Sequence, residues 1–129
     1  MKENKKIMLV DDDQKNIFAL RLTLVSKGYA CICVQDAREA IGRLRETAAE
    51  VGLVLMDMMM PEMDGYEAIA IIKEDNQINR IPIVAVTAQA MTGDREKCLD
   101  AGAVAYLSKP IDVDQLLIII DQHFNPSSN

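Results

Sequence analysis

The chain has little of what thiolate metal sites, membrane segments and nucleic-acid interfaces require. Its cysteines are Cys31, Cys33 and Cys98, and its single histidine is His123. Because no Cys-x-x-Cys pair occurs, we expect small, buried, reduced cysteines rather than a disulfide or a zinc site. The net charge of −6 argues against nucleic acid as a direct partner. The first apolar run, Ile7–Val10, is too short for a signal peptide or a membrane span, which predicts a cytoplasmic protein.

The chain also shows no sign of a division into parts. Its 129 residues fit one domain, and no repeat, linker or low-complexity stretch interrupts them. A composition of 50% hydrophobic and 26% charged residues is ordinary for a soluble globular domain. We therefore expect a single domain over 1–129, with its core at about 5–124 and a frayed tail at 125–129.

Short apolar runs alternate with segments of helical periodicity. The expected strands are Ile7–Val10, Tyr29–Val34, Val51–Met56, Ile81–Val86 and Val104–Leu107. The expected helices carry Ile17, Leu20 and Leu24 before a stop at Gly28; Ala37, Ala40, Ile41 and Leu44; Ile69 and Ile72 after an N-cap at Asp64; Arg95–Ala101; and about Asp112–His123. Strands that are apolar on both faces belong in a parallel sheet with helices on both sides. The pattern predicts an α/β, doubly wound fold, in which ligands bind beyond the carboxyl ends of the strands.

Reactive side chains stand at those strand ends. The first strand ends in Asp11, Asp12 and Asp13, the third in Asp57, the fourth in Thr87 and the fifth in Ser108-Lys109-Pro110. Crowded carboxylates raise each other's pKa, so a cation must compensate them. Lys109 supplies one positive charge, and Mg²⁺ suits the remaining oxygen ligands. A carboxylate in such a site can attack phosphorus and form an aspartyl-phosphate.

Each of these residues also has an ordinary structural explanation. Asp13 is expected to be the N-cap of the first helix, and Asp11 and Asp12 alone could be turn residues. Thr87 alone could be a strand-end hydroxyl, and Lys109 alone a solvated charge. Their combination at four strand ends is what favours a phosphorylation site.

Five segments resemble the receiver domains of two-component response regulators, including the single-domain chemotaxis regulators. They are Ile7–Asp13, Val54–Pro61, Met63–Gly65, Val86–Ala88 and Lys109–Pro110, in the family's order and spacing. The resemblance implies a flavodoxin-like sheet of strand order 2-1-3-4-5 with five helices on both faces. It also implies self-catalysed phosphorylation and dephosphorylation rather than turnover of a substrate by an enzyme.

The resemblance further assigns roles at the site. Asp57 would be the phosphoacceptor and would bind Mg²⁺ with Asp12, while Asp11 would act through water and the backbone carbonyl of Met59 would add a ligand. Lys109 would pair with Asp57 and then with the phosphoryl group, oriented by a cis bond to Pro110.

A second set of residues would switch the domain and tune its rates. Thr87 would move toward the phosphoryl group and Tyr106 would turn inward with it. Ala88 would flank access to the site, and Met59 and Gln89 would flank the path of attacking water. Met59 stands where the family more often has a polar residue, which puts fast hydrolysis in doubt. The rest of the Met58–Met60 run is expected to pack, with Met60 in the core.

Partners also follow from the resemblance. The donor would be a phosphohistidine on a histidine kinase or phosphotransfer domain, docking near Asn16 and Ala19. Leu116–Ile120 is a run of five apolar residues, which one helix face cannot bury, so we expect part of it to be exposed. This fits the family's signalling face of fourth helix, fifth strand and fifth helix, which would bind a downstream protein or a second copy.

Other functions remain open at this stage. A pseudo-receiver would bind partners without phosphorylation, although the chain keeps every site residue. A haloacid-dehalogenase-like phosphatase would need Asp-x-Asp, whereas Met58 and Met59 follow Asp57. No P-loop motif occurs. Thr87–Cys98 resembles hybrid-kinase receivers, so a free-standing regulator, a relay intermediate and a hybrid-kinase receiver all stay open.

Overall fold

The computed structural model describes residues 5–88 and 92–124. They form one parallel five-stranded sheet in the order β2-β1-β3-β4-β5. The elements are β1 (Lys6–Val10), α1 (Gln14–Ser26), β2 (Ala30–Val34), α2 (Ala37–Thr47), the short 3₁₀ helix η1 (Ala48–Glu50), β3 (Val51–Asp57), α3 (Gly65–Lys73), β4 (Ile83–Thr87), α4 (Asp94–Ala101), β5 (Ala105–Ser108) and α5 (Val113–His123). The predicted fold class and strand order are confirmed; η1 was not predicted.

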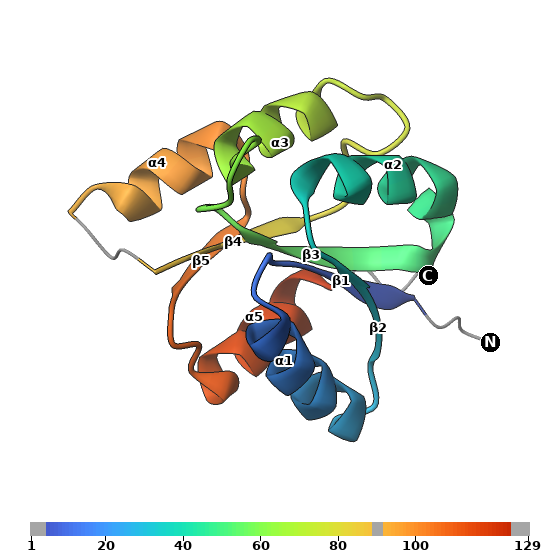
Figure 1. Cartoon of the computed structure of the whole chain (residues 1–129), viewed down its shortest axis with the longest axis vertical. Coiled ribbons are helices and arrows are strands. Elements are labelled where there is room, and N and C mark those ends of the chain that lie inside the picture. Colours follow the sequence, from blue (N-terminus) through green and yellow to red (C-terminus); the bar gives the residue numbers. More distant parts are fainter. Residues whose placement is uncertain (1–4, 89–91, 125–129) are drawn as a thin grey trace.

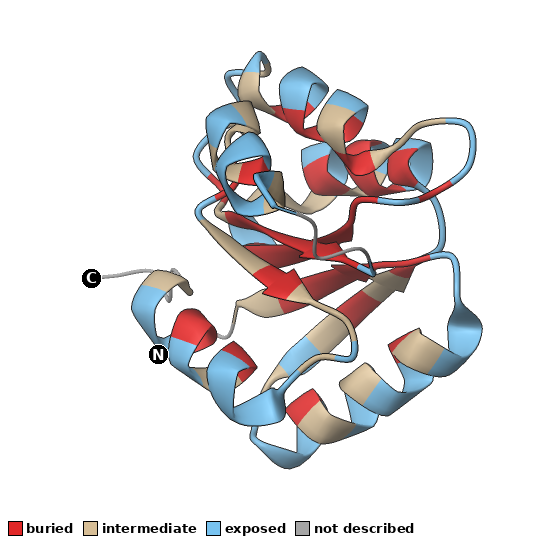
Figure 2. Cartoon of the chain, turned by 90° about the vertical axis from the view of Figure 1, so that its left-hand side faces the viewer, coloured by how far each residue is buried: buried red, intermediate tan, exposed pale blue. Residues whose placement is uncertain are grey.

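The helices cover the two faces of the sheet. Figure 1 shows α2, α3 and α4 on one face and α1 and α5 on the other. Successive side chains of β1 enter opposite cores, since Met8 packs toward the first face and Ile7 and Leu9 toward the second. Every residue of β3 is buried, as expected for a central strand between two helical layers. Figure 2 shows this arrangement as buried strands between helices whose outer sides are exposed.

Aspartates cap the N-termini of several helices and so fix where each helix begins. The Asp13 carboxylate accepts hydrogen bonds from the backbone of Lys15 and Asn16, and Asp112 does the same at the start of α5. Asp64 and Glu67 form a reciprocal capping box at α3. The N-caps predicted at Asp13 and Asp64 are confirmed.

One sequence-based expectation needs correction. Cys31 and Cys33 are half-buried rather than buried, because β2 is an edge strand; Cys98 is buried as expected. Gly65, next to the Asp64 N-cap, is the buried first residue of α3. Its position admits no side chain because a Cβ there would lie 2.8 Å from the Met58 Cα.

The last helix agrees with the expectation from the sequence. Leu116, Ile119 and Ile120 of α5 are buried while Ile118 is 59% exposed, so part of the apolar run does face solvent. Within residues 5–88 and 92–124, no helix has the length and apolar character needed to cross a membrane.

Candidate functional site

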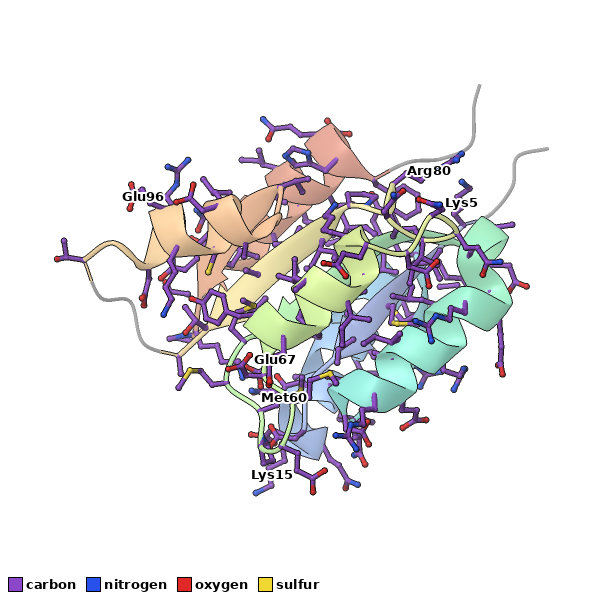
Figure 3. All side chains as sticks on the ribbon, turned by 90° about the horizontal axis from the view of Figure 1, so that it is seen from above. Lys5, Lys15, Met60, Glu67, Arg80 and Glu96 are labelled. Carbon is purple, nitrogen blue, oxygen red and sulfur yellow. The ribbon has the colours of Figure 1, made fainter. Side chains whose placement is uncertain are left out.

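The parallel strands bring residues that are distant in sequence to one rim of the sheet. Asp57 lies beside Val86 in the strand register, and Thr87 lies beside Ser108. Asp11 follows β1 directly, and its backbone N–H donates to the Val34 carbonyl. Figure 3 shows Met60 and Lys15 at this end of the molecule, and Lys5 and Arg80 at the opposite end.

Three carboxylates meet at this rim. Oxygens of Asp11, Asp12 and Asp57 all lie within 4.8 Å of one another. Asp11 and Asp57 are buried, whereas Asp12 is exposed. The backbone N–H of Asp13 donates to Asp11 Oδ1 at 2.8 Å, which holds the Asp11 carboxylate inward. The predicted grouping of these acids is therefore present, with Asp13 set apart as a helix cap.

The surroundings of Asp57 disfavour the charged form of its carboxylate. Burial is the largest cause that raises its pKa above the ordinary carboxyl value. The Met59 N–H, 3.1 Å from Asp57 Oδ1, opposes that shift, while the negative charge of Asp11 adds to it. A site built in this way gains stability from any cation that can enter it.

Lys109 supplies positive charge from the other side of the rim. Its ammonium lies 3.0 Å from Asp11 Oδ2 and 3.6 Å from Asp57 Oδ2. Burial alone would lower the pKa of Lys109, but the hydrogen bond to Asp11 and the charges of Asp57 and Asp11 raise it above its ordinary value. The Lys109 backbone N–H also donates to the Thr87 carbonyl at 2.8 Å, and the bond to Pro110 is cis.

The remaining predicted residues differ in how far their side chains are exposed to solvent. Thr87 is buried at the end of β4, and Ala88 after it is exposed. Tyr106 of β5 is half-buried against the core shared with α2, α3 and α4, and burial is the main cause that raises its pKa. The Met59 side chain is 52% exposed, while Met58 and Met60 are buried, as expected for Met60. Gln89 lies outside the described residues.

Two features of the site were not predicted. The backbone N–H of Met59 contacts the central carboxylate, and no side-chain pattern reveals a backbone donor. The Gly65 N–H donates to the Met58 carbonyl at 3.2 Å, so α3 begins directly against the residue that follows Asp57. The glycine next to the Asp64 N-cap was the available signal for this close approach.

The donor set matches a hard divalent cation. Asp11, Asp12 and Asp57 offer oxygen atoms only, and the described residues place no histidine or cysteine among them. Oxygen ligands from a few carboxylates suit Mg²⁺ rather than a thiophilic metal. The residues present therefore fit the predicted ion.

Comparison with known proteins agrees with this geometry. Residues 7–121 match the family model described as the response regulator receiver domain. The chain belongs to this family. The receiver is 36% identical over 119 residues to a protein of Brucella anthropi named polar-differentiation response regulator DivK, covering 92% of this chain and 95% of the relative.

Solved receiver structures share the fold. One is the receiver domain of a sensor histidine kinase from Pseudomonas aeruginosa, with a magnesium ion coordinated in its active-site cleft. It is 35% identical, has a TM-score of 0.83 and covers 94% of this chain and 98% of that one. Another is the receiver domain of a histidine kinase from Syntrophus aciditrophicus, 28% identical with a TM-score of 0.81, covering 92% and 88% of the two chains. The chain is thus a receiver of two-component signalling, and neither the pseudo-receiver nor the phosphatase alternative is favoured.

Proposed function

We propose that Asp57 accepts a phosphoryl group from a phosphohistidine donor on a histidine kinase or phosphotransfer domain. The observation that carries this proposal is the placement of a buried Asp57 carboxylate between Lys109 and two further acids. An exposed surface aspartate would have neither the compensating cation nor the oriented backbone donor from Met59. Asp57 is therefore the carboxylate best prepared to act as a nucleophile.

The transfer is a substitution at phosphorus. An Asp57 oxygen forms a bond to phosphorus as the bond to the donor imidazole nitrogen breaks, and the imidazole takes up a proton. Lys109 neutralises charge on the phosphoryl oxygens, and the Thr87 hydroxyl donates a hydrogen bond to one of them. Asp11, Asp12, Asp57 and the Met59 carbonyl would hold Mg²⁺, which would supply further positive charge beside the phosphoryl group.

Phosphorylation then shifts the population between two surface states. Thr87 moves toward the phosphoryl group and half-buried Tyr106 turns inward, which alters the surface of α4, β5 and α5. The exposed apolar side chain of Ile118 on α5 is available for such a contact. We infer that a downstream protein binds there, with a second copy of the receiver as the competing occupant.

The same site sets the lifetime of the aspartyl-phosphate. Exposed Met59 and Ala88 directly follow the loop start at Met58 and the end of β4 at Thr87, next to the site, and we expect both to restrict attacking water, as we expect of Gln89 from its place in the sequence. An apolar Met59 excludes a water that a polar side chain would hold. We therefore expect slow self-catalysed dephosphorylation.

Two broader statements complete the proposal. Residues 1–129 form one receiver domain with its working core at about 5–124, in agreement with a family match over 7–121. The domain works in the cytoplasm, where histidine kinases present their phosphohistidines. The relatives include a response regulator and the receiver domains of histidine kinases. Phosphoryl transfer should therefore be measured both from a histidine kinase and from a phosphotransfer domain.

The deciding experiment is self-labelling with acetyl phosphate and Mg²⁺, resolved on a phosphate-affinity gel. We expect a labile shifted band in the parent that EDTA abolishes. Asp57→Asn should show no band, whereas Asp121→Asn, at an exposed carboxylate of α5, should be labelled like the parent. Labelling of Asp57→Asn, or no labelling of the folded parent by acetyl phosphate and by a phosphorylated kinase, would contradict the proposal.

A further inference from the structure

The edge strand β2 leaves main-chain hydrogen-bonding groups unused. In the part of the chain that the structure describes, β2 pairs only with β1. The Val34 carbonyl accepts from Asp11 and so faces inward. Because successive strand residues direct their backbone groups to opposite sides, the N–H and C=O groups of Cys31 and Cys33 point to the open edge. The five residues of β2 contain no proline and no charge, the usual means of blocking an edge.

A groove runs along this edge between the two helical layers. Its volume is about 710 Å³, and its walls come from α1 on one side and α2 on the other. Cys31 and Cys33 form its floor, with Phe18 and Arg21 on the α1 wall and Arg43 on the α2 wall. Phe18 is 62% exposed, so an apolar contact is available beside the unpaired backbone. Figure 1 shows β2 at the margin of the sheet between α1 and α2.

The groove is positive in a chain whose net charge is −6. Lys6, Arg21 and Arg43 line it against the single acid Glu39. Because Lys6 is paired with Glu50 at 3.5 Å, the positive charge open to a partner comes from Arg21 and Arg43. The Arg43–Glu39 pair is long, at 3.9 Å, and exposed, so it competes weakly with a new partner. Burial raises the pKa of Cys31 to about 11, and the neighbouring Cys33 adds to the shift, so the floor is uncharged at neutral pH.

We propose that this groove binds an extended, acidic segment of a partner protein, which adds to β2 as a sixth strand. The backbone groups of Cys31 and Cys33 give the hydrogen bonds, Phe18 contacts an apolar side chain, and Arg21 and Arg43 select for carboxylates. The groove lies on the β2 edge and shares no residue with the Asp57 site, so the proposal goes beyond phosphoryl transfer. A second copy of the chain is a poorer occupant, because pairing of two β2 edges would bring the arginines of both copies together.

The test uses two peptides that differ only in charge. Acetyl-Thr-Glu-Val-Glu-Val-Glu-Val-Thr-amide and its counterpart with lysine at each glutamate are titrated into the full chain and followed by NMR. We expect the acidic peptide to shift the Cys31 and Cys33 amide signals and to slow their hydrogen exchange. The lysine peptide should bind about tenfold more weakly. Equal binding of both peptides, or shifts that leave β2 unaffected, would overturn the proposal.

Two variants separate the backbone and charge contributions. Cys33→Pro removes an outward N–H without touching the β1 ladder and should abolish the shift of the Cys31 amide, while Cys33→Ala keeps the N–H and should bind like the parent. Arg21→Gln should weaken the acidic peptide alone. Retained labelling at Asp57 checks that each variant is folded. Parent-like binding of the acidic peptide by folded Cys33→Pro would contradict the proposal. A concentration-dependent dimer in sedimentation that Cys33→Pro abolishes would also contradict it, because the occupant would then be a second copy of the chain.

Discussion

The carboxyl-end rim of the sheet and the sheet interior beneath it are both buried, but they bury opposite kinds of side chain. Among the described residues, the buried polar or charged ones are Asp11, Asp57 and Thr87, and all three lie at the rim. One or two residues further down the same strands, the side chains are entirely apolar, as at Val10 and Met56. Burial stabilises the interior, whereas at the rim it disfavours the charged form of the carboxylates. The comparison teaches that one sheet supplies stability along its length and reactivity at its end.

The largest effect on stability is expected in the interior. Leu53→Ala should lower the free energy of unfolding by about 2 to 5 kcal/mol, because Leu53 is fully buried and the change leaves a cavity. Urea denaturation would measure this difference. Leu22→Ala is the matched control, since Leu22 is exposed on α1 and its loss should change little. Equal costs at the two positions would break the distinction between core and surface.

A smaller effect is expected when the cation of the rim is removed. Lys109→Met should lower the free energy of unfolding in EDTA by about 1 to 3 kcal/mol, because Asp11 and Asp57 then face each other without compensation. The double variant Lys109→Met/Asp57→Asn should recover part of that loss, as a double-mutant cycle in urea would show. Strict additivity of the two substitutions would contradict the coupling.

Removal of the central charge should have the opposite sign. The pKa of Asp57 is raised in the folded state, so between the ordinary carboxyl pKa of about 4 and the raised value the folded protein binds more protons than the unfolded one. The free energy of unfolding therefore falls as pH rises through this window. Asp57→Asn in EDTA should be more stable than the parent at pH 7, by on the order of 1 kcal/mol, the scale of a single substitution.

This advantage should disappear under two conditions. Below about pH 4 the parent carboxyl is protonated in both states, so the two proteins should converge. Saturating Mg²⁺ should stabilise the parent more than Asp57→Asn, because the ion binds the folded carboxylates. Thermal unfolding at several pH values, with EDTA or Mg²⁺, would test both. A parent more stable than Asp57→Asn at pH 7 in EDTA would show that burial does not dominate at Asp57.

The smallest effect on stability belongs to the exposed margin of the rim. Met59→Asn should change the free energy of unfolding by no more than about 0.5 kcal/mol, since the Met59 side chain is half exposed. The aspartyl-phosphate should nevertheless decay faster, by up to about tenfold, which corresponds to about 1.4 kcal/mol in the barrier. Decay of labelled protein after removal of donor would measure the rate. An unchanged lifetime would remove Met59 from the rate-tuning residues.

The sequence by itself determined the α/β alternation and which residues stand at the strand ends. Strands such as β3 are apolar at every position because both faces are covered, and this local pattern is legible without coordinates. Since parallel strands all end at the same rim, the grouping of Asp11, Asp57, Thr87 and Lys109 followed from the fold class. Aspartate N-caps at Asp13 and Asp64 were likewise local signals.

Tertiary structure decided what depends on lateral position and on the backbone. β2 has the composition of a buried strand, and only its place at the sheet margin leaves Cys31 and Cys33 half-exposed over a groove. The Met59 N–H that supports Asp57 has no side-chain signature, and the contact that requires Gly65 comes from the path of the loop before α3. Asp11 and Asp12 are chemically identical neighbours, yet one is buried against Lys109 and the other is exposed. Periodicity reports which face of an element is covered, whereas its neighbours and backbone contacts exist only after the elements have packed.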